Sequence, residues 1–144
     1  MKKVLLYAMC ILLFSCEDKF TNEEGQVDTR TLLGTWLLYE KGYSPGAGYI
    51  VEAVDAELEQ TITFKNNHRM EVTIPWLGDF EYYAVMMDEN NQDVVLAFYE
   101  SNPGPSPKLS SSDHKYTLVT DENGIKLYFR FCIEGCHLAL KRVD

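Results

Sequence analysis

Residues 114–131 read HKYTLVTDENGIKLYFRF, and this stretch decides the expected fold. Apolar residues alternate with polar ones in its second half, because Lys126, Tyr128 and Arg130 separate Ile125, Leu127, Phe129 and Phe131. Successive side chains of a strand point to opposite faces, so a period of two predicts a strand with one buried face. The Asp121–Gly124 segment has turn-forming residues and joins this strand to a second alternating run, His114–Thr120. The stretch therefore predicts a β-hairpin whose apolar set faces a core.

The same alternation recurs along the chain on both sides of this hairpin. Further strands are expected at Leu33–Glu40, Leu58–Lys65, Arg69–Ile74, Phe80–Met87, Asp93–Glu100 and Leu138–Val143. We expect their inward residues to include Trp36, Leu38, Ile62, Phe64, Met70, Val72 and Ile74. Tyr49–Val54 is one more candidate strand, although Val51–Glu59 could instead form a short helix. Ser101–Asp113 is rich in Pro, Gly and Ser and is expected to be a long loop.

Short strands joined by hairpins, with no long helical pattern after the N-terminal region, predict an antiparallel meander. A meander of about eight strands can close into a barrel whose interior holds side chains or one small ligand. We therefore expect an all-β protein with an antiparallel up-and-down β-barrel of about eight strands. This barrel is expected to form a single domain over residues 32–144.

The N-terminal segment has the pattern of a bacterial lipoprotein precursor. An uncharged run from Val4 to Ser15 follows Lys2 and Lys3, and Leu13-Phe14-Ser15-Cys16 reads as a lipobox. As a helix this run would rise about 18 Å, too little for a hydrocarbon core of about 30 Å. We expect residues 1–15 to be a signal peptide and residues 16–31 an acylated Cys16 with a flexible tether. The alternative is an ordinary secretory signal that happens to carry a cysteine.

This anchor predicts where the protein is located. Lipidation at Cys16, detectable as palmitate, would hold the domain at a membrane of the cell envelope, most simply the outer membrane. Glu17-Asp18-Lys19 resembles the surface-export signal of Bacteroidota lipoproteins, or else simply begins a solvated linker. Loss of the signal would remove two lysines and no acid, which changes the formal charge from −9 to −11. So acidic a chain is not expected to bind nucleic acid, because phosphate binding needs clustered Lys and Arg.

Cys132 and Cys136 remain for the folded domain, in the sequence CIEGC. An oxidising compartment permits a disulfide bond, and the spacing suits a hairpin in which both cysteines end their strands. Gly135 would then supply the positive φ of a three-residue loop. A metal site that includes His137 lacks a fourth ligand in the sequence, and the spacing is not that of a redox Cys-x-x-Cys pair. We expect a structural disulfide bond and no metal.

Leu33-Gly34-Thr35-Trp36, at the start of the first strand, resembles the Gly-x-Trp opening of lipocalins and their calycin relatives. With the lipobox, the Ser44-Pro45-Gly46 turn and the CIEGC loop, the chain from about Leu32 to Val143 resembles lipocalin-like lipoproteins of Bacteroidota. The resemblance implies an eight-stranded barrel in which Trp36 closes one end beneath a basic side chain. Arg142 is the matching position, and Gly34, Trp36 and Arg142 are therefore expected to be structural. The chain is short and lacks a clear C-terminal helix, which departs from true lipocalins.

The sequence holds none of the common catalytic, phosphate-binding or dinucleotide-binding motifs, so we expect neither an enzyme nor a cofactor. Our first hypothesis is a lipoprotein whose barrel binds a small apolar or amphipathic ligand. The candidate ligand-binding residues are Tyr43, Tyr49, Met70, Tyr82, Met86 and Phe98. The alternative is an interaction module that binds an envelope protein or glycan through an exposed aromatic face. This alternative rests on the strands at Phe80–Met87 and Asp93–Glu100, which are apolar on both faces unless a loop covers one.

Overall fold

The computed structural model describes residues 29–143. The predicted signal peptide, Cys16 and most of the predicted tether lie outside the described residues. The strands are β1 (Gly34–Tyr43), β2 (Ile50–Ala53), β3 (Thr61–Phe64), β4 (Met70–Val72), β5 (Tyr82–Asp88), β6 (Asp93–Tyr99), β7 (His114–Asp121), β8 (Gly124–Phe129) and β9 (His137–Arg142). Short 3-10 turns join them: η1 (Thr29–Leu32), η2 (Ala56–Leu58), η3 (Asn66–His68), η4 (Pro75–Leu77) and η5 (Leu109–Ser111).

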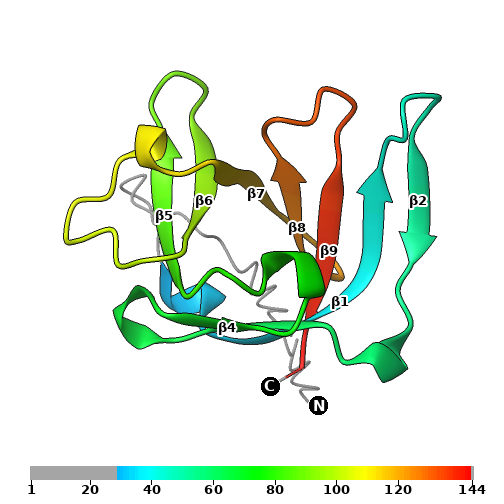
Figure 1. Ribbon diagram of the computed structural model, residues 1–144, viewed down its shortest axis with the longest axis horizontal. Helices are drawn as coiled ribbons and strands as arrows, with labels where there is room; N and C mark the ends of the chain where they lie inside the picture. The colour runs from blue at the N-terminus through cyan, green and yellow to red at the C-terminus, as the bar shows by residue number, and fades with distance from the viewer. Residues whose placement is uncertain (1–28, 144) are drawn as a thin grey trace, which may run out of the picture.

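The strands form one antiparallel sheet in the order β4-β3-β1-β9-β8-β7-β6-β5, which curls into a nearly closed barrel (Figure 1). The first strand pairs with the last, and β1 also pairs with β3 at its beginning and with β2 at its end. Only one isolated bridge, from Arg69 just before β4 to Tyr82 of β5, links these two edges of the sheet within the described residues. The prediction of an all-β, up-and-down antiparallel barrel is confirmed. The candidate strand at Tyr49–Val54 is likewise confirmed, and only the single turn η2 remains of the helical alternative.

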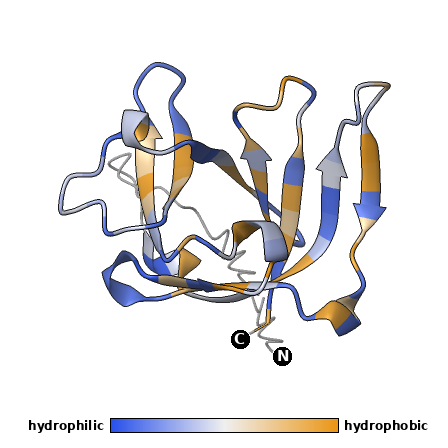
Figure 2. Cartoon of the chain, in the orientation of Figure 1, coloured by the Kyte–Doolittle hydropathy of each residue, from blue (hydrophilic) through white to orange (hydrophobic). Residues whose placement is uncertain are grey.

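The barrel interior is filled by the residues that the alternation places inward. One core cluster contains most of the residues predicted to face inward. They are Trp36, Leu38, Ile62, Phe64, Met70, Ile74, Ile125 and Leu127, and all are buried. Apolar segments therefore recur along the strands of the barrel, and the turn between β5 and β6 is hydrophilic (Figure 2). Burial of this apolar surface is the main favourable contribution to folding, and it fixes the register of each strand.

Trp36 and Arg142 close the end of the barrel at which β1 begins. They are paired across β1 and β9, and the guanidinium carbon of Arg142 lies 4.9 Å from the centroid of the Trp36 ring. The indole Nε1 donates a hydrogen bond to the Leu32 carbonyl at 2.8 Å, and Arg142 donates one to the Thr31 carbonyl at 2.5 Å. Gly34 has a φ of +118°, a conformation that side-chain-bearing residues rarely adopt. The sequence Gly34-x-Trp36 thus places the indole beneath Arg142.

The loop between β8 and β9 differs from the prediction. Cys132 and Cys136 are disulfide-bonded with Cα atoms 5.6 Å apart, and Gly135 has a φ of +83°, as expected. However, β8 already ends at Phe129, where the Phe129 amide donates to the Cys136 carbonyl, so neither cysteine is part of a strand. The predicted inward position of Phe131 is therefore wrong, and its side chain is 59% exposed. The period of two ends where the loop begins.

The doubly apolar pair β5 and β6 is covered on its outer side in part by the long loop. Ala84, Ala97 and Tyr99 are buried in a small second cluster outside the barrel. The Tyr99 hydroxyl donates to the Lys108 carbonyl at 3.4 Å, and the Ser112 hydroxyl donates to the Phe98 carbonyl at 2.7 Å. The loop of residues 101–113 is thereby fixed to β6. Its packing explains why these strands are apolar on both faces.

Candidate functional site

A cavity of about 410 Å³ opens at the end of the barrel opposite Trp36 and Arg142. Its wall comes from the end of β1, the starts of β7 and β9, the end of β8, and the turn η4. The lining residues are Lys41, Gly42, Tyr43, Trp76, His114, Tyr116, Phe129, Cys136, His137 and Leu138. The core cluster fills the other half of the barrel, so the cavity is confined to this end.

Strand register explains how these residues come to face the cavity. Tyr116 is directly opposite Phe129 across β7 and β8, and Lys41 is opposite Leu138 across β1 and β9. A bulge in β1 between Leu38 and Glu40 adds one residue and shifts the alternation, so that Lys41 shares the inward face of Leu38. Without this bulge a lysine would not point into the barrel.

Lys41 and Tyr43 share one carboxylate at the rim of the cavity. Glu52 of β2 lies 3.4 Å from the Lys41 ammonium and accepts a 2.6 Å hydrogen bond from the Tyr43 hydroxyl. The hydrogen bond from Tyr43, followed by the neighbouring Lys41, holds the pKa of Glu52 below its usual range. The same bond raises the pKa of Tyr43. The Lys41 ammonium also lies 5.8 Å from the centroid of the Trp76 ring, so a cation and an exposed indole meet at this rim.

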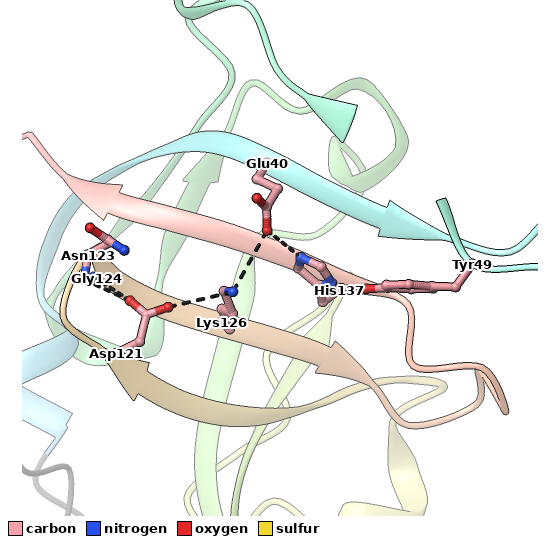
Figure 3. Close-up of polar contacts among 7 residues, drawn as sticks. All are labelled: Glu40, Tyr49, Asp121, Asn123, Gly124, Lys126 and His137. Atoms are coloured by element: carbon pink, nitrogen blue, oxygen red, sulfur yellow. Dashed lines mark hydrogen bonds and ion pairs between the residues drawn. The ribbon is translucent and has the colours of Figure 1, made fainter. Parts of the chain in front are cut away.

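A polar network covers the outer face of the same wall (Figure 3). Glu40 accepts a 2.9 Å hydrogen bond from Nε2 of His137, and its other neighbour is Lys126 at 3.8 Å. Nδ1 of His137 is hydrogen-bonded to the Tyr49 hydroxyl. Both nitrogens of this buried imidazole are therefore engaged within the chain.

Gly42 makes room for this network. His137 is paired with Gly42 across β1 and β9, and the Tyr49 hydroxyl and the His137 ring lie directly over the glycine. A Cβ at residue 42 would be only 2.6 Å from Cε1 of His137, closer than real Cβ atoms come to other heavy atoms. The φ of Gly42 is not positive, so backbone conformation does not require a glycine here. The close approach of the Tyr49 and His137 side chains does.

The candidate ligand-binding residues from the sequence are not brought together. Tyr43 lines the cavity, and Tyr49 lies on the outer side of the wall against His137. Met70 and Phe98 are buried in the core, where the Phe98 ring lies 5.2 Å from that of Tyr116. Tyr82 and Met86 pack outside the barrel against the second cluster. They lie there because β5 alternates, which places Tyr82, Ala84 and Met86 on the face opposite Tyr83.

Several cavity residues were not among the ligand-binding candidates predicted from the sequence. They include Lys41, Trp76, His114, Tyr116 and Phe129. The strict alternation of β7 and β8 could have indicated Tyr116 and Phe129, since both share the inward parity of Leu118 and Leu127. Lys41 is oriented by a bulge, and Trp76 belongs to a turn. No sequence pattern indicated either position.

Fold and cavity together define an all-β barrel that is closed at one end and hollow at the other. Comparison with known protein families, with curated proteins and with solved structures finds no match to this chain. Residues 29–143 contain no cluster of three His, Cys, Asp or Glu side chains arranged to hold a metal ion. No helix in this described part is long and apolar enough to cross a membrane.

Proposed function

We propose that this protein is a membrane-anchored lipoprotein whose lipocalin-like barrel binds a small amphipathic ligand. The observation that carries the proposal is the cavity of about 410 Å³ at one end of the barrel. Pockets for small molecules are typically about 300–1,000 Å³, mostly apolar, with a few placed polar groups. Tyr43, Trp76, Tyr116, Phe129 and Leu138 supply the apolar surface here.

The anchor rests on the lipobox at residues 13–16, and one substitution tests it. Cells that express the chain are grown with radiolabelled palmitate, and the protein is then isolated. We expect label on the unchanged chain and none on the Cys16→Ala variant. Label that persists on this variant would refute acylation at Cys16.

Ligand binding is tested by native mass spectrometry of the protein purified from its own cells. We expect a co-purifying small mass on the unchanged chain. Phe129→Ala removes part of the cavity wall and should reduce the bound fraction, whereas Tyr128→Ala on the outer face of the same strand should leave it unchanged. A bare chain that gains no mass from a panel of lipids and metabolites would refute ligand carriage and favour the interaction module instead.

A further inference from the structure

The wall of the cavity differs in charge from the rest of the chain. The protein has 22 acidic and 13 basic residues, yet none of the ten residues that line the cavity is acidic. One is a lysine and two are histidines. The nearby acids are already engaged, since Glu52 is bound by Lys41 and Tyr43 and Glu40 by His137. The cavity wall thus gathers hydrogen-bond donors without any acidic lining residue.

Tyr116 is a buried tyrosine whose hydroxyl has no hydrogen-bond partner among the described residues. Its residue is only 5% exposed, and no side chain or backbone group of residues 29–143 forms a hydrogen bond with its hydroxyl. The hydroxyl is not sealed within protein, because the only such buried oxygen in the described chain is Oε1 of Gln60. It therefore opens on the cavity that Tyr116 lines. Burial raises the pKa of Tyr116 to about 12, so this phenol stays protonated and can donate.

His114 lies two residues before Tyr116 on the same face of β7, and its imidazole is the second polar group of the wall without a hydrogen bond inside residues 29–143. Its ring packs 4.5 Å from the Phe80 ring and 5.8 Å from the Phe129 ring, centroid to centroid. Neither ring nitrogen makes a hydrogen bond within the described residues, in contrast to both nitrogens of His137. His114 is half-buried, whereas Tyr116 is buried. Buried polar groups are normally hydrogen-bonded, so the open hydroxyl of Tyr116, with the imidazole of His114 beside it, points to a partner from outside the chain.

We propose that the cavity binds the acidic head group of an amphiphile, with the phenol of Tyr116 and the imidazole of His114 donating to it. Lys41 supplies the positive charge at the rim. When the ligand binds, the Lys41 ammonium leaves the Glu52 carboxylate and pairs with the acidic group of the ligand. The aromatic rings of Phe129 and Trp76 hold the apolar body of the ligand. This inference rests on the proposed function and specifies the ligand class for the same cavity. An acidic head group fits this wall because the Tyr116 hydroxyl and the His114 imidazole can each donate a hydrogen bond, Lys41 carries a positive charge, and no lining residue is acidic.

Two fluorescent probes that differ in one acidic group test the proposal. Anilinonaphthalene sulfonate and phenylnaphthylamine share the same aromatic body, and only the first carries a sulfonate. The full chain is titrated with each probe, with chain-free buffer as the blank. We expect the sulfonate probe to bind about tenfold more tightly than the neutral probe, as charge-assisted hydrogen bonds are about twice as strong as neutral ones.

Variants assign this preference to the cavity. Tyr116→Phe and Lys41→Met should each weaken the sulfonate probe about fivefold to tenfold and leave the neutral probe within about twofold. Lys108→Met, which removes the same charge from the exposed loop, should change neither affinity. Circular dichroism of each variant checks that the barrel is intact.

The outcomes separate this inference from the proposed function. Equal affinity for both probes, or equal losses for both in Tyr116→Phe, would overturn the acidic head group and leave ligand binding standing. If neither probe binds the unchanged chain, both the inference and the proposed cavity function are overturned.

Discussion

His137 and His114 both border the cavity, but their side chains lie on opposite faces of the barrel wall and have different surroundings. His137, on the outer face, has Nε2 bound to Glu40 at 2.9 Å and Nδ1 bound to Tyr49. His114, on the inner face, packs between aromatic rings and has no hydrogen bond on its imidazole within the described residues. Tyrosines repeat the contrast, because Tyr49 is engaged outside and Tyr116 is open inside.

The difference separates polar groups that serve stability from those that serve binding. A buried polar group without a partner costs free energy, so a chain keeps one where an external partner completes it. The outer network is complete within the chain, and its loss should destabilise the barrel. The inner donors are incomplete, and removal of their polar atoms should leave stability unchanged or improve it.

Gly42→Ala should have the largest effect, because it forces the outer network off its strand. The new Cβ would meet the buried ring of His137 and the Tyr49 hydroxyl, and neither can withdraw without loss of its hydrogen bonds. We expect a loss of about 3 kcal/mol in the free energy of unfolding, the upper part of the range for overpacking. Urea unfolding followed by circular dichroism measures it.

Gly78→Ala is the matched control, since its Cβ would meet nothing closer than the Pro75 carbonyl oxygen at 3.7 Å. That variant should be as stable as the unchanged chain, or more stable by about 0.5 kcal/mol. Equal stability of the two variants would show that the approach over Gly42 is unimportant.

His137→Phe and His114→Phe compare the two histidines directly. His137→Phe leaves the Tyr49 hydroxyl unpartnered and deprives Glu40 of its closest donor, so we expect a loss of about 2 kcal/mol. His114→Phe keeps a ring among Phe80 and Phe129 and breaks no hydrogen bond of the imidazole, so stability should change by less than about 0.5 kcal/mol. Thermal and urea unfolding of both variants provide the measurement. A larger loss for His114→Phe would contradict the distinction between the faces.

Tyr83→Phe and Tyr116→Phe make the same comparison for two buried tyrosines. The Tyr83 hydroxyl donates to the Lys65 carbonyl at 3.0 Å, whereas the Tyr116 hydroxyl has no partner in residues 29–143. We expect Tyr83→Phe to lose about 1 kcal/mol, the net contribution of one hydrogen bond, and Tyr116→Phe to lose nothing. Urea unfolding midpoints decide the order. Identical losses would mean that Tyr116 has a structural partner.

The sequence predicts the barrel well because apolar and polar residues alternate along the strands. This alternation indicates which side chains face the interior and which face outward. Ile62, Phe64, Ile125 and Leu127 are inward as the pattern requires, and the contact between Arg142 and Trp36 is present. The pattern fails where the strand ends, as at Phe131, because alternation in the sequence continues for two residues beyond the end of β8 at Phe129.

The cavity is much less predictable than the fold. Which inward residues fill the core and which border a hollow depends on volume at one end of the barrel, and this is a property of all strands together. Tyr116 and Met70 have the same inward parity, but only Tyr116 borders the cavity. The orientation of Lys41 depends on the bulge between Leu38 and Glu40, and no residue type in β1 predicts that bulge.

The pairing of Asp88 with Arg130 should make the free energy of unfolding depend on pH in the acid range. Its carboxylate accepts a 2.6 Å hydrogen bond from Arg130 and a second from the Asn90 amide, and these bonds lower the pKa of Asp88 in the folded state. A lowered folded-state pKa means that the unfolded chain takes up the proton first as the pH falls. The stabilisation is therefore complete above the ordinary value of 3.8 and is lost as the pH falls through the lower folded value. Asp88→Asn should flatten the acid side of the stability profile, measured as the unfolding midpoint between neutral pH and pH of about 2.

Asp79→Asn, at an exposed position with no ion pair among the described residues, should keep the profile of the unchanged chain. An unaltered acid slope in Asp88→Asn would show that the pairing with Arg130 contributes nothing to stability.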